Sequence, residues 1–196
     1  MRGMAVRLRL VIGGMVACVG CAAAMVWMVV MPEHTNAMGG MLVVDPLTKL
    51  VKVALLALAI FTILISIESI FTAHVGEYLA LVLLATVGMM FMVSAEDILM
   101  IFVSLEMTSL SLYVLTAFNK RDIKSAEAAL KYFLFGGMSA AFMLFGLSLI
   151  YGLSGSTNLG EIATFLKGRG LDPLLVVAIV MTVALWRKRP SGSSGS

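Results

Sequence analysis

The sequence predicts an all-α fold, a polytopic bundle of about six transmembrane helices of which the last is short. Three observations lead to this class. Of the 196 residues, 61% are hydrophobic and only 13% are charged. The mean hydropathy is +1.05, far from the balance of a soluble domain. A bilayer core about 30 Å thick takes about 20 apolar residues per helix, so this length allows at most about six spans with short loops.

Apolar runs place the predicted helices in order along the chain. The first five runs are long enough to cross a bilayer. The sixth, of roughly 14 residues, would reach only about 21 Å, so we expect it to be a spanning helix that is interrupted. The six runs are residues 10–31, 47–71, 77–94, 98–118, 126–153 and 173–186.

The first run follows three arginines, Arg2, Arg7 and Arg9, as the apolar part of a secretory signal would. Its length of about 22 residues exceeds the roughly 7 to 15 of a signal and favours an uncleaved membrane helix. Lipoprotein processing at Cys18 or Cys21 is the alternative. Zinc binding would need two further ligands, so we interpret these two cysteines as small packing residues.

Capping patterns support several of the helix boundaries. Asp45 precedes Pro46 and Asp172 precedes Pro173, an N-cap followed by proline at the first helical position. A polar turn at residues 119–125 is short enough to join two antiparallel helices tightly.

A further short helix is expected between residues 154 and 170. Asn158 and Glu161 have the spacing of a capping box, and the apolar residues that follow fall on one helical face. Such a helix suits the membrane surface.

Charge sets the orientation. The formal net charge is only +3, and the basic residues form short clusters between the apolar runs, so nucleic acid is not an expected partner. By the positive-inside rule the more basic side is cytoplasmic, and it holds both ends of the chain. Residues 187–196 form a basic and Gly/Ser-rich tail with nothing to pack. The basic residues of the cytoplasmic side are Arg2, Arg7, Arg9, Lys120, Arg121, Lys124, Arg187, Lys188 and Arg189; the other side has Lys49, Lys52, Lys167 and Arg169.

Glu106 is the principal candidate for function. It stands about nine residues into the run that starts near Ile98, close to the bilayer midplane. An ionised carboxylate there costs at least about 2.5 kcal/mol, so it should face other helices or water. Phe102, Ser109 and Tyr113 share its helical stripe and supply two hydroxyl neighbours. We interpret Glu106 as a proton site, since burial raises a carboxyl pKa and a nearby cation lowers it; the alternative is a helix-joining hydrogen bond.

For other polar residues of the predicted spans, a purely structural role is the alternative to a role in proton transfer. Glu127 and Lys131 are spaced i, i+4 with the glutamate first, the favourable order for an ion pair. They are candidates for the same proton path, or else a helix-end pair that reaches toward the membrane interface. A second stripe of the same run carries hydroxyls that we expect to bond back to their own helix: Ser104, Thr108 and Ser111. The sequence contains no Gly-rich phosphate loop, metal-ligand cluster or Ser/His/Asp arrangement.

The segments that contain Glu106, Glu127 and Lys131 resemble a known family. The stretch GEYLALVLLATVGMMFMVSAEDILMIFVSLEMTSLSLYVLTAF, followed by SAEAALKYFLFGG and LFGLSLIYGLSGS, resembles subunit N of bacterial NADH-quinone oxidoreductase, respiratory complex I. That subunit is one of several antiporter-like, proton-translocating membrane subunits. The resemblance implies that Glu106 is the half-channel glutamate and that Glu127 and Lys131 are the charged pair beside the cytoplasmic entry.

The resemblance also implies a setting. The chain would be a translocase subunit of the respiratory chain in the bacterial cell inner membrane, in contact with lipid, protons and the other membrane subunits of complex I. NADH, FMN, iron-sulfur clusters and quinone would be handled by those other subunits. No cofactor, metal or redox chemistry is therefore expected in this chain itself.

The resemblance covers roughly residues 42–184 and departs at both ends. The chain begins at what would be the family's second helix. Near Ala184, family members continue into a lysine and then a proline, phenylalanine and histidine within the same helix, a pattern that residues 186–196 do not follow. We therefore expect a truncated subunit, a partial first repeat without the lysine partner of Glu106. Two alternatives stay open: a subunit of a multi-subunit cation/proton antiporter or membrane-bound hydrogenase, and an inactive truncated fragment.

Overall fold

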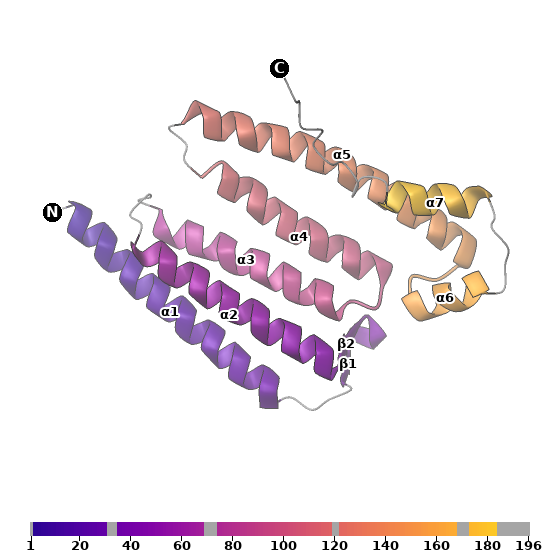
Figure 1. Cartoon of the computed structure of the whole chain (residues 1–196), viewed down its shortest axis with the longest axis horizontal. Coiled ribbons are helices and arrows are strands. Elements are labelled where there is room, and N and C mark those ends of the chain that lie inside the picture. The colour runs from indigo at the N-terminus through magenta and orange to yellow at the C-terminus, as the bar shows by residue number, and fades with distance from the viewer. Residues whose placement is uncertain (1, 31–34, 69–73, 119–121, 168–172, 184–196) are drawn as a thin grey trace, which may run out of the picture. The chain divides into compact units, whose positions relative to one another are not determined.

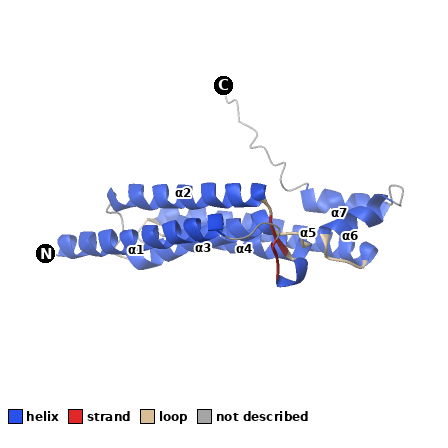
Figure 2. Ribbon diagram, turned by 90° about the horizontal axis from the view of Figure 1, so that it is seen from below, coloured by secondary structure: helices blue, strands red, loops and turns tan. Residues whose placement is uncertain are grey.

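The computed structural model describes residues 2–30, 35–68, 74–118, 122–167 and 173–183, which are almost entirely helical (Figures 1 and 2). Five of the helices are long and apolar enough to cross a membrane, and a sixth apolar helix is shorter. The elements are α1 Arg2–Val30, β1 Thr35–Ala37, η1 Met38–Gly40, β2 Leu42–Val44, α2 Pro46–Glu68, α3 Val75–Ser94, α4 Ile98–Thr116, α5 Ile123–Ser154, α6 Leu159–Lys167 and α7 Pro173–Val183.

The prediction of an all-α membrane bundle is confirmed. The predicted starts at Pro46 and Pro173 are the observed ones, and α1 begins earlier than its apolar run because the arginine-rich segment is also helical. Some predicted features lie outside the described residues: the ends of the runs at 71 and 186, the turn residues 119–121, and the tail 187–196.

The chain divides into two compact units, Met1–Phe133 and Leu134–Ser196. In the first unit α3 packs against α4, α1 against α2, and α2 and α1 against α3. Figure 1 shows these four helices as neighbours in chain order. Ile63 lies at the centre of this packing and is fully buried. Val75 and Leu79 of α3 pack with it and are also buried.

The buried face of α2 is a single stripe with one residue per turn. The spacing alternates between four and three residues, as a helix that presents one face to its neighbours requires. At one end of the stripe the Ser66 hydroxyl lies 2.9 Å from the Tyr78 hydroxyl of α3 and links the two helices. The buried residues are Lys52, Leu56, Ala59, Ile63 and Ser66.

A small antiparallel hairpin between α1 and α2 is an element that the sequence patterns did not predict. Strands β1 and β2 pair Thr35 with Val44, and the chain reverses through Gly39 and Gly40. These glycines have φ values of 70° and 91°, a region that residues with a side chain rarely adopt. Strands of three residues are too short to show an alternating pattern, so periodicity does not predict them.

The hairpin covers one end of the bundle. Leu42 forms a bridge with Ala95 in the turn between α3 and α4, and the backbone N–H of Glu96 donates to the Met41 carbonyl at 2.9 Å. At the same turn the buried Asp97 caps α4, its Oδ1 accepting from the Leu99 backbone N–H at 2.8 Å. This end of the first unit is therefore closed by backbone pairing as well as by side chains.

The second unit contains the rest of α5 with α6 and α7. The predicted helix in the 154–170 segment is present as α6, and the Asn158 side chain caps it by accepting from the Gly160 N–H at 2.8 Å and from the Glu161 N–H at 3.3 Å. Helices α5 and α7 approach closely at Gly146, where a Cβ would lie 2.9 Å from the Ala178 carbonyl oxygen.

Candidate functional site

Helix α4 has two polar faces, and the first belongs to the packing of the bundle. The hydroxyls of Ser104, Thr108 and Ser111 donate to carbonyls one turn earlier on α4, at 2.6, 2.9 and 2.8 Å. This agrees with the expectation that they bond back to their own helix. The same face meets α3 at Gly88, where an added Cβ would lie 3.0 Å from the Thr108 backbone nitrogen and 3.1 Å from the Ser104 carbonyl oxygen.

The second face carries Glu106. This residue lies two positions after Ser104 and two before Thr108, so it points to nearly the opposite side of the helix from the α3 contact. The Glu106 side chain is partly buried. Tyr113 interacts electrostatically with it, and Ser109 is close enough to hydrogen-bond with Tyr113. The structure thus places together the carboxylate and the two hydroxyls that the stripe predicted.

Tyr113 also connects this face to α5. It is buried, and its ring meets those of Tyr132 and Phe133 edge-on, with centroids 4.7 and 5.9 Å away. Edge-to-face pairs at such distances add about 0.5 to 1.5 kcal/mol beyond area burial. The phenol is therefore held in one place by two rings of the neighbouring helix.

Glu127 and Lys131 form the predicted ion pair on α5, with the Lys131 Nζ donating to Glu127 Oε1 at 2.5 Å. Their side chains are 59% and 65% exposed, respectively. Ala129, midway between them, is buried on the other side of the helix, the side from which Ser125 donates to the Thr116 carbonyl of α4 at 2.6 Å. The pair therefore faces away from α4.

The structure does not join the three predicted charges into one cluster. Within the described residues, no hydrogen bond or ion pair links Glu106 to Lys131 or to another cation. Glu106 has hydroxyl neighbours, whereas the α5 pair is self-contained.

Sequence reasoning missed one charged residue. Lys52 was counted only as a cation near a helix start, but the structure buries it on the core-facing stripe of α2. The signal was present in the spacing of Lys52, Leu56, Ala59 and Ile63, which places the lysine in line with three apolar residues.

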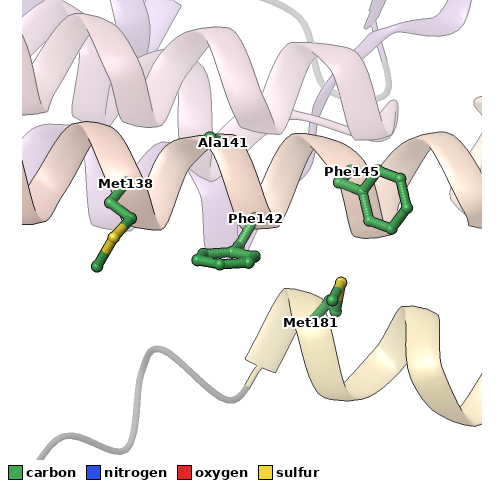
Figure 3. Close-up of a pocket in the computed structure, with 5 residues that line it drawn as sticks. All are labelled: Met138, Ala141, Phe142, Phe145 and Met181. Atoms are coloured by element: carbon green, nitrogen blue, oxygen red, sulfur yellow. The ribbon is translucent and has the colours of Figure 1, made fainter.

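No group of three or more His, Cys, Asp or Glu side chains suited to a metal ion occurs in the part of the chain that the structure describes. His74 lies in an ion-pair position 3.3 Å from Glu77 at the start of α3. In the second unit an apolar pocket of about 420 Å³ lies between α5 and α7 (Figure 3). It is lined by Met138, Ala141, Phe142, Phe145 and Met181.

Comparison with known proteins adds to this geometry. A family model described as NADH:quinone oxidoreductase/Mrp antiporter, TM, matches residues 95–191, a range that contains Glu106, Glu127 and Lys131. NADH-quinone oxidoreductase subunit N 2 of Acidobacterium capsulatum is 52% identical over 153 residues, covering 74% of this chain and 31% of that protein. Subunit N 1 of Koribacter versatilis is 45% identical over 159 residues, covering 77% and 31%.

Solved structures share the fold. A chain of respiratory complex I from Thermus thermophilus with bound aureothin matches with a TM-score of 0.69 and 29% identity, over 92% of this chain and 41% of that one. A chain of the membrane-bound sulfane sulfur reductase, an archaeal respiratory membrane complex, matches with a TM-score of 0.73 and 26% identity, over 90% and 38%. The chain spans about a third of the length of the curated relatives named above.

Proposed function

Because the chain belongs to the NADH:quinone oxidoreductase/Mrp antiporter family of membrane proteins, we propose that it takes part in proton translocation coupled to electron transfer from NADH to quinone. It does so as one membrane subunit of a larger complex in the bacterial inner membrane. Identity of 52% to a subunit N favours this role over that of a cation/proton antiporter subunit. The predicted resemblance to subunit N is confirmed.

The observation that carries the proposal is Glu106 on a membrane-crossing helix, grouped with Ser109 and Tyr113. A carboxylate at this depth is costly unless it has polar neighbours or takes up a proton. Hydroxyl groups both donate and accept hydrogen bonds, so they can pass a proton to and from a carboxylate without themselves becoming charged. In this proposal Glu106 holds the proton and the two hydroxyls orient it.

Glu127 and Lys131 take a secondary part. Their ion pair lies near the start of α5, beside the predicted cytoplasmic turn. A charged pair at a helix end can bias the charge of a nearby proton site as the pair opens and closes. Electron transfer and its cofactors belong to other subunits in this proposal, and both ends of the chain are cytoplasmic.

Glu106→Gln in the complete subunit tests the proposal, because glutamine keeps the shape and hydrogen bonding of the side chain but cannot hold a proton as a carboxylate does. NADH-driven acidification of inside-out membrane vesicles is measured with a pH-sensitive dye, alongside NADH oxidation and the amount of assembled subunit. We expect pumping per assembled complex to fall several-fold while assembly changes little. Unchanged pumping at normal assembly would refute the proposal.

Glu77→Gln is the matched control. Glu77 is also a glutamate of a membrane-crossing helix, but its side chain is 61% exposed in the first turn of α3, where it pairs with His74. The same substitution there should leave pumping at the level of the unaltered protein. Proton flux through liposomes that contain this chain alone would separately show whether it conducts protons without its partners.

A further inference from the structure

Lys52 is a buried cation inside a membrane-crossing helix. It lies six residues after Pro46, so its Cα is about 9 Å along α2 from the helix start, within the predicted span. Only 7% of its surface is exposed. Lysines in membrane helices are rare, face the protein interior or water, and mark ion or proton pathways.

The burial of Lys52 differs from that of a lysine that merely reaches the interface. Such a side chain covers its stem with apolar surface and leaves the ammonium in water. Lys131 is of this more exposed kind, with 65% of its side chain accessible. Lys52 instead continues the stripe of Leu56, Ala59 and Ile63, so protein rather than lipid covers it.

No charged group within the described residues balances the charge of Lys52. Among the described residues it forms no hydrogen bond or ion pair, and no charged group interacts with it. An ammonium group that is buried without a partner carries a desolvation cost.

The ionisable groups at this end of the first unit are otherwise engaged or placed elsewhere. Asp45, which precedes α2, and Lys49 of α2 each have an interaction of their own, and Asp97 caps α4. Glu96, in the turn beneath the hairpin, is exposed. The packed half of α1 offers the buried thiol of Cys21, and β2 has no ionisable side chain. Among the residues that the structure describes, Lys52 therefore has no ion-pair partner on the elements that pack on it.

We infer that Lys52 is a second proton-exchanging residue of this chain, at the end of the bundle that the β1–β2 hairpin covers. The neutral amine takes a proton from water onto its nitrogen, and the ammonium later returns it; no other bond changes. This inference deepens the proposed function and rests on it. It assigns a proton site on α2, away from the Glu106 face of α4.

Substitutions at Lys52 in the complete subunit test whether charge or proton exchange matters. Lys52→Arg keeps the charge but cannot release a proton in a protein. Lys52→His restores a group that titrates near neutral pH. We expect pumping per assembled complex to fall several-fold with arginine and to be higher with histidine than with arginine. Full pumping with arginine, or more pumping with arginine than with histidine, would overturn the inference.

Lys49→Arg is the matched control, because Lys49 lies one turn nearer the start of α2, is only partly buried and has an interaction of its own. It should pump normally. If Glu106→Gln lowers pumping but Lys52→Arg does not, the inference fails and the proposed function survives. If Glu106→Gln leaves pumping unchanged, the proposed function itself fails.

Acylation of the unaltered protein in its complex gives a measurement that no folding defect can disturb. A small amine-reactive acylating reagent modifies lysine only in its neutral form. Mass spectrometry measures the acylated fraction of the Lys52 and Lys49 peptides from neutral to alkaline pH. We expect Lys52 to react at lower pH than Lys49. A reaction at the same or higher pH, or none at any pH, would mean that Lys52 does not exchange protons with water.

Discussion

The two polar faces of α4 differ in what their polar groups do. On the face toward α3, the hydroxyls of Ser104, Thr108 and Ser111 each donate a hydrogen bond to a carbonyl of their own helix. On the other face, Glu106 has no cation beside it within the described residues and shares its stripe with Ser109 and Tyr113. Each face carries three polar side chains in the sequence.

The difference lies in whether the polar group can be satisfied locally. A serine or threonine in a helix reaches the carbonyl one turn earlier, which leaves a small side chain and permits close helix packing. An ionised glutamate has no hydrogen to donate to that carbonyl, so it depends on neighbouring donor groups or on taking up a proton. The hydroxyl face is thus structural, and the carboxylate face is the one that we propose for proton transfer.

The largest predicted effect is on the structural face. Gly88→Ala should lower the stability of the protein by about 1 to 3 kcal/mol, since overpacking a tight contact shifts backbone. The added Cβ would meet backbone atoms of Thr108 and Ser104 at 3.0 and 3.1 Å, and backbone cannot rotate aside as a side chain can. Thermal unfolding of the chain in detergent measures this.

Gly76→Ala provides the comparison on the same helix. A Cβ at Gly76 would have nothing within 4 Å, so stability should stay level or rise by up to about 1 kcal/mol through helix propensity. Equal unfolding temperatures for the two variants would show that α3 and α4 are not held at the distance that Gly88 allows.

A smaller effect is expected on the carboxylate face. Tyr113→Phe keeps the ring contacts with Tyr132 and Phe133 but removes the hydroxyl beside Ser109. Pumping per assembled complex should fall about threefold, roughly 0.6 kcal/mol in activation free energy, with no loss of assembly. Ser111→Ala, which removes a hydroxyl of the other face, should pump normally. If both variants pumped alike, the two faces would not differ in function.

Much of the helical arrangement could be predicted because apolar runs of bilayer length admit only helices or closed barrels. Proline and capping residues then gave starts such as Pro46 and the Asn158 cap. The stripe of Glu106 with Ser109 and Tyr113 was also accessible, since helical periodicity alone groups them. The proton-transfer role that we assign to it stays a prediction.

The rest depended on packing between helices, which periodicity cannot supply. The hairpin of β1 and β2 depends on Gly39 and Gly40 and on a bridge to Ala95, more than fifty residues away in the chain. The burial of Lys52 follows from which face of α2 meets its neighbours. The sequence placed Glu127 and Lys131 together but did not show that they point away from α4.

The smallest predicted effect concerns that ion pair. An i, i+4 pair of glutamate before lysine contributes about 0.3 to 0.5 kcal/mol when exposed. Because Glu127 and Lys131 are 59% and 65% exposed and face away from α4, their coupling to Glu106 should be weak. A double-mutant cycle of Glu127→Gln and Lys131→Met, read by thermal unfolding, should give that coupling energy.

Pumping by Lys131→Met, compared with pumping by Glu106→Gln, shows which of the two helices, α5 or α4, contributes more to the proton path. Lys131→Met should lower pumping less than Glu106→Gln does, because the pair only biases the charge near the carboxylate. A loss equal to or greater than that of Glu106→Gln would reverse the ranking. In that case the exposed lysine of α5, and not the α4 carboxylate with its hydroxyls, would be the group on which transfer chiefly depends.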